Sequence, residues 1–107
     1  MSTATAIPVS VTPEAAEYVE GLGLQPEFQA MLEHSRKTID GLREIAVVLE
    51  DFPGTGVDPS VVLRVSRDDP RPNDLAHRHW NEWQLATFSP DVWRHFSLVL
   101  VDATDGR

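Results

Sequence analysis

The apolar residues of this sequence change their spacing along the chain, and this change limits the fold more than any other feature. From Pro13 to about Leu42 they recur every three or four residues, as in helices that bury one face. In residues 44–52 and 60–68 they alternate, as in strands with one buried face. Helical spacing returns at Leu75, and residues 96–103 again have the apolar run of a strand. The sequence therefore predicts helices and strands mixed in one chain.

Start and stop signals divide the first helical part into two helices. Thr12 can cap a helix that begins at Pro13, and the Gly-Leu-Gly at 21–23 ends it. A second helix is expected from Pro26 to about Leu42. Its apolar seam predicts packing against the first helix and a sheet, with a helical dimer interface as the alternative.

Local signals also place the later elements. The PGTGVDP segment joins the two alternating strands, so they are predicted to form a hairpin with a long loop. Asn73 or Asp74 can begin a third helix that fades near Thr87, and Ser89-Pro90 begins a short further turn. The predicted order is α-α-β-β-α-β.

This order predicts the α+β fold class, as a two-layer domain with helices packed on one face of a small sheet. A right-handed crossover after the second strand would place the third strand beside the first, giving a mainly antiparallel three-stranded sheet in the order 2-1-3. At 107 residues we expect a single domain, spanning 12–103. Residues 1–11 are interpreted as a loose arm that could pair through IPVSV, and residues 104–107 as a tail.

Composition and charge exclude several classes of function. The formal net charge is −8, and residues 1–35 contain five glutamates and no Lys or Arg, so a nucleic-acid partner is not expected. No segment approaches the roughly 18 apolar residues of a membrane span. The chain has no cysteine, which excludes disulfides, thiolate nucleophiles and iron–sulfur ligation. We expect a cytoplasmic protein without a cofactor, whose N-terminus lacks the pattern of a signal peptide.

The segment LAHRHWNEW, residues 75–83, is the densest in chemically active side chains. At about 100° per residue, Trp80 and Trp83 fall on one face of the third helix, so they are predicted to anchor it. His77 and His79 lie about 200° apart on such a helix and cannot easily share a metal ion. The segment is interpreted as a well-anchored helix.

A metal-binding protein or small enzyme is the main alternative. His79 and Glu82 are three residues apart, a spacing that can ligate a metal or transfer a proton, and His95 is a further candidate ligand. Other signatures are missing: the Gly54-Thr55-Gly56 turn lacks the lysine and following helix of a phosphate loop, and no nucleophile elbow is present. The sequence assigns no catalytic residue.

The leading hypothesis is a small, soluble, non-enzymatic protein-interaction or regulatory module, with a homodimer as one form. Three tryptophans lie close together, and Leu85 falls opposite the tryptophan face of the third helix, which indicates self-association or a protein partner. Three glutamates on the first helix are predicted to form a docking face for a basic partner. A small-molecule sensor is a further alternative. The candidate partner-binding residues are Trp80, Trp83, Leu85, Trp93, Glu14, Glu17 and Glu20.

Overall fold

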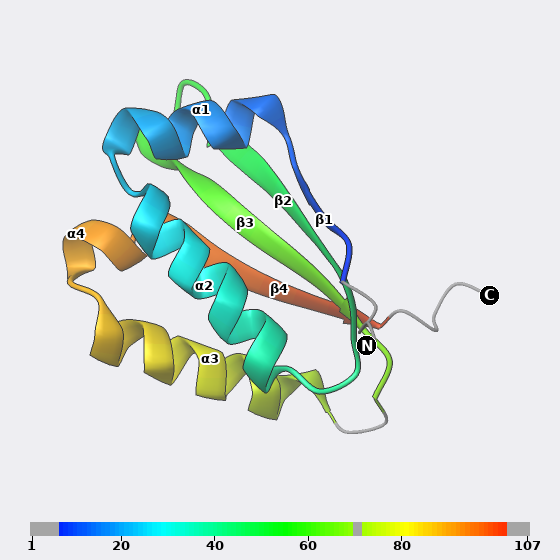
Figure 1. The fold of residues 1–107 in the computed structure, drawn as a ribbon. Coiled ribbons are helices and arrows are strands. Elements are labelled where there is room, and N and C mark those ends of the chain that lie inside the picture. Colours follow the sequence, from blue (N-terminus) through cyan, green and yellow to red (C-terminus); the bar gives the residue numbers. More distant parts are fainter. Residues whose placement is uncertain (1–6, 70–71, 103–107) are drawn as a thin grey trace.

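A computed structural model describes residues 7–69 and 72–102 (Figure 1). The elements are β1 (Val9–Val11), α1 (Pro13–Leu22), α2 (Gln25–Thr38), β2 (Leu42–Phe52), β3 (Val57–Arg67), α3 (Asn73–Thr87), α4 (Pro90–Trp93) and β4 (Phe96–Asp102). The predicted α+β class is confirmed. Residues 1–6 of the predicted arm and residues 103–107, which include the predicted tail, lie outside the described residues.

The four strands form one mixed sheet in the order β1-β2-β3-β4. β2 and β3 are the predicted antiparallel hairpin, whereas β1 pairs parallel to β2 and β4 pairs parallel to β3. The predicted three-stranded, mainly antiparallel sheet with order 2-1-3 is therefore wrong in these details. The edge of β2 is occupied by β1, the IPVSV part of the arm, and the connection through α3 is long enough for β4 to return parallel beside β3.

The sheet buries one face under the helices (Figure 1). Its register aligns the apolar side chains of this face into rows across the strands, one of which consists of Val11, Val47, Leu63 and Leu98. Phe28, Met31 and Leu32 of α2 complete the buried core from above. The opposite face mixes polar side chains with valines: Val62 is buried there, whereas Arg64 and Val99 are exposed. Strand alternation in the sequence thus corresponds to two chemically different faces.

The predicted signals account for the ends of α1. The Thr12 hydroxyl accepts a hydrogen bond from the Ala15 amide at 3.2 Å, and Gly23 adopts a left-handed φ of 70° at the other end. By contrast, α2 ends at Thr38 and not near Leu42 as predicted, because Ile39 is extended and Gly41 turns the chain into β2 with a φ of 75°. Leu42 continues the apolar spacing of α2 but belongs to the strand.

Gly41 allows us to predict a large effect from one added methyl group. A Cβ at this position would lie 2.6 Å from the carbonyl oxygen of Asp68, and the positive φ disfavours any other residue. We expect Gly41→Ala to lower the free energy of unfolding, measured with urea, by about 2 kcal/mol. The control is Gly21→Ala in α1, where no atom lies within 4 Å and alanine should instead stabilise by about 0.5–1 kcal/mol. Equal effects of the two substitutions would contradict this account of the turn.

Candidate functional site

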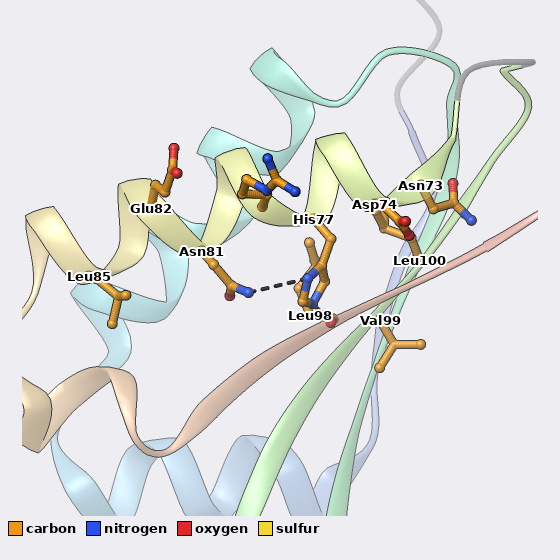
Figure 2. Close-up of a pocket in the computed structure, with 10 residues that line it drawn as sticks. Asn73, Asp74, His77, Asn81, Glu82, Leu85, Leu98, Val99 and Leu100 are labelled. Atoms are coloured by element: carbon orange, nitrogen blue, oxygen red, sulfur yellow. Dashed lines mark hydrogen bonds between the residues drawn. The ribbon is translucent and has the colours of Figure 1, made fainter.

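A groove runs between α3 and the outer edge of β4 (Figure 2). It consists of two adjoining hollows of about 600 and 490 Å³, which share His77, Asn81, Leu85 and Leu98 in their linings. One hollow extends toward Asp74 and Leu100, and the other toward Trp93. The groove therefore follows most of the length of the edge strand.

Side chains from α3 satisfy carbonyl groups of β4 in the groove. The Asn81 amide donates to Nδ1 of His77 at 3.2 Å (Figure 2), which leaves Nε2 as the ring nitrogen that donates to the Leu98 carbonyl at 3.0 Å. The amide of Gln84, which is buried, donates to the Phe96 carbonyl at 3.4 Å. These contacts cover part of an edge that would otherwise present free backbone groups. This role of His77 and Gln84 was not predicted from the sequence.

Exposed apolar side chains lie on both sides of the groove. Leu85 of α3 is 53% exposed and Val99 of β4 is 42% exposed. Leu75 of α3 is also half exposed, farther around the helix. Leu85 was predicted from its angular position opposite the tryptophans, and its exposure agrees with that geometry. Three of the seven exposed large apolar side chains of the described residues therefore lie on α3 and β4.

The opposite side of α3 is its anchor. Trp80 is 1% exposed, and its indole N–H donates to the Ser35 hydroxyl of α2 at 3.0 Å. Ser35 in turn donates to the Met31 carbonyl at 2.8 Å. Trp80 therefore lies in the core and has no surface to offer a partner. Trp83 is half-buried beside it, as the predicted anchoring face requires.

Trp83 stacks on His34 of α2, with ring centroids 3.8 Å apart and nearly parallel planes. Burial lowers the pKa of His34 below its ordinary value, and the Lys37 ammonium lowers that pKa further. The stacked imidazole is therefore neutral at pH 7. Because the unfolded chain binds this proton more readily, the free energy of unfolding falls as the pH drops from the ordinary histidine pKa through the lowered pKa of His34.

The remaining predicted partner-binding residues lie on separate surfaces. Trp93 is half-buried in α4 and lines one end of the groove. Glu14, Glu17 and Glu20 are exposed on α1, away from the groove lining. The structure thus brings Trp93 and Leu85 to one groove and leaves the three glutamates on another element.

The three candidate metal ligands have different surroundings. His79 is exposed and lines a hollow with Arg67 and Thr38, whereas Glu82 lies on the groove side of α3. His95 is buried and hydrogen-bonds through Nδ1 to the Tyr18 hydroxyl at 3.2 Å. Within residues 7–69 and 72–102, no group of three metal-ligating side chains comes together.

Tyr18 connects α1 to the start of β4 through His95. Its hydroxyl also contacts the Pro59 carbonyl at 3.3 Å. Because the hydroxyl has one proton to donate, Tyr18 can donate to Pro59 while His95 donates to Tyr18. Burial raises the pKa of Tyr18 above its ordinary value, and the Asp58 carboxylate raises it further. The pair joins three elements at the end of the sheet.

Arg67 is a buried charged residue that the sequence analysis did not single out. It is 3% exposed at the end of β3, and its guanidinium donates to the Asp40 carbonyl at 3.2 Å and to Asn73 Oδ1 at 2.8 Å. It also forms an ion pair at 3.5 Å with Asp69, whose side chain is 9% exposed. The signal was present, because residue 67 continues the buried series of odd-numbered positions in β3.

The chain matches no protein-family model, no curated protein and no solved structure. Among the described residues, none of the helices has the length and apolar character needed to cross a bilayer. The function is therefore inferred from the geometry of the surface formed by α3 and β4.

Proposed function

We propose that this chain is a protein-interaction module that binds another polypeptide through the outer side of α3 and the adjoining β4 edge. The observation that carries the proposal is the groove itself, with Leu85 and Val99 exposed along an apolar edge strand. Natural proteins usually protect such edges with charges, prolines, short strands or a covering helix. The segment from Phe96 to Val101 has no charge and no proline, and α3 covers only part of its edge. An edge of this kind favours contact with a second chain.

The polar groups of the groove favour orientation of a bound chain over catalysis. His77 is held by Asn81 and Leu98, and therefore both of its ring nitrogens already have partners. Asp74, Arg78 and Glu82 place charges of both signs along α3. Mixed charges beside apolar contacts are typical of the rim of a protein interface. We also propose that the protein is cytoplasmic, as expected from its sequence.

The acidic face of α1 stays a separate prediction. Glu14, Glu17 and Glu20 are exposed and would suit a basic partner, as the sequence analysis proposed. Partner binding there would not require the groove. The two surfaces can therefore be tested against each other.

Site-specific photo-crosslinking in the source cells tests the proposal. Replacing Leu85 with p-benzoyl-phenylalanine should give a covalent adduct whose second component is identified by mass spectrometry. The matched control places the same side chain at Glu17, which is exposed on α1. We expect an adduct at position 85 and none at position 17. Adducts at position 17 alone would move the binding surface to α1, and no adduct at either position would contradict the proposal.

A further inference from the structure

Four exposed side chains form a line along the outer side of α3. They follow one another at intervals of three, four and three residues, and lie within about 80° of one another around the helix axis. The two at the ends are leucines, 50% and 53% exposed, and the two between them are exposed charged residues. We call this line the α3 stripe: Leu75, Arg78, Glu82 and Leu85.

The α3 stripe is symmetric about position 80. The leucines lie five residues to either side of this position, and Arg78 and Glu82 lie two residues to either side. A second α3 placed antiparallel, with a two-fold axis beside position 80, would set Leu75 against Leu85 and Arg78 against Glu82. Both contacts would occur twice, which is the pattern of an isologous interface. Intervals of three and four residues are also those by which two helices pack along a seam.

The two charges of the α3 stripe are available for such contacts. No ion pair within the described residues uses Arg78 or Glu82. Within the helix, an arginine that precedes a glutamate by four residues is the weaker of the two orientations. An opposite charge on a facing helix would therefore stabilise Arg78 and Glu82 more than their pairing within one helix does.

We infer that a second copy of this chain docks antiparallel on the α3 stripe and forms a two-fold dimer. The inference rests on the proposed function, because it names the partner of the same surface. The net charge of −8 would otherwise repel two copies, so self-association requires local complementarity, which Arg78 and Glu82 supply. Only four side chains of each copy form the inferred contact, so we expect a dissociation constant in the micromolar range.

Charge reversal tests the inference by sedimentation velocity on the purified full chain. Arg78→Glu makes both central charges of the α3 stripe acidic, and Glu82→Arg makes both basic. In either homodimer two like-charged contacts replace two opposite ones, so we expect each variant to weaken dimerisation by about tenfold or more. An equimolar mixture of the two variants should dimerise again, because acidic then faces basic at both contacts. The double variant, Arg78→Glu with Glu82→Arg, should behave like the wild type.

A matched mixture separates this contact from a general effect of charge. Glu17→Arg on α1 changes the net charge as much as Glu82→Arg does, and it should dimerise at least as well as the wild type. When Glu17→Arg is mixed with Arg78→Glu, however, the two variants should not form a heterodimer with wild-type affinity. Thermal unfolding would check that each variant is folded, which the exposure of the substituted side chains leads us to expect.

The outcomes are decisive for a dimer of this geometry. A wild-type chain that stays monomeric to high micromolar concentration would overturn it, as would unchanged dimerisation of both single variants or failure of their mixture to dimerise. If the wild type is monomeric but position 85 still crosslinks to a different protein, the proposed function stands and the second copy is excluded. If dimerisation follows the charge pattern, the adduct at position 85 should have the mass of two chains.

Discussion

Replacing Arg67 with alanine is expected to lower the free energy of unfolding by about 3–5 kcal/mol, a large fraction of the stability of a small domain. The guanidinium joins the segment before β2 to the start of α3, through the Asp40 carbonyl and the Asn73 side chain. Its loss would leave the carboxylate of Asp69 buried without this ionic partner, and removal of one member of a buried ion pair is strongly destabilising. Urea unfolding followed by circular dichroism measures the difference.

Arg43→Ala is the matched control for this substitution. Arg43 also forms an ion pair, with Asp68 at 3.1 Å, but both side chains are about half exposed. Water screens such a pair, so its loss should cost at most about 1 kcal/mol. Arg67→Lys should fall between the two, because lysine keeps the charge but not the planar set of donors. A loss of less than about 1 kcal/mol for Arg67→Ala would show that the buried network is dispensable.

Arg67 also shows which features of the fold could be predicted from the sequence and which could not. Alternation of apolar residues predicted most of the buried side chains of β2 and β3, and position 67 continues that alternation. Val62 is an exception, because it lies on the other face and is also buried. The predicted strand, residues 60–68, included Arg67, but the burial of this residue was not predicted, and arginines are usually exposed. Its partners come from the ends of other elements, and their convergence depends on tertiary structure.

The predicted order of the strands was wrong for a similar reason. Helix caps such as Thr12 and Gly23 are local, so the sequence predicts them well. The choice of edge for β4 depends on which edge is already occupied, and the three-residue β1 is too short to give a clear periodic signal. The short pairing of β1 with β2 therefore determined the strand order, which the pattern of the longer strands alone does not specify.

The candidate site was predictable in part. The angular spacing on α3 correctly separated the inward Trp80 from the outward Leu85. The groove could not be predicted, because it exists only when β4 lies beside α3, and the incorrect strand order placed β4 elsewhere. The role of His77 was missed for the same reason, since its acceptor is the Leu98 carbonyl of β4.

The inward and outward sides of α3 depend on each other. The α3 stripe keeps its line of contacts only if the helix is fixed in rotation, and the inward side chains fix it. Trp80 packs in the core and hydrogen-bonds α2, while Trp83 stacks on His34. A substitution that removes one of these inward contacts should therefore shift the α3 stripe, even though no residue of the stripe is changed.

Trp80→Ala is expected to be the most damaging single substitution in α3. Removing a large aromatic side chain that is 1% exposed leaves a cavity and should lower the free energy of unfolding by about 3–5 kcal/mol. Trp80→Phe keeps most of the volume but loses the indole donor. Because Ser35 still donates to the Met31 carbonyl, this smaller change should cost about 1–2 kcal/mol.

Trp93→Ala provides the same chemical change at a half-buried position at the end of the groove. It removes less buried surface and should cost about 1 kcal/mol, measured by the same urea titration. If Trp80→Ala and Trp93→Ala prove equally destabilising, α3 is not anchored as described. If Trp80→Phe stays folded, its dimerisation provides a further comparison: a rotated α3 should weaken the dimer even though the α3 stripe is unchanged. Loss of dimerisation in a folded Trp80→Phe would connect the core of this domain to its binding surface.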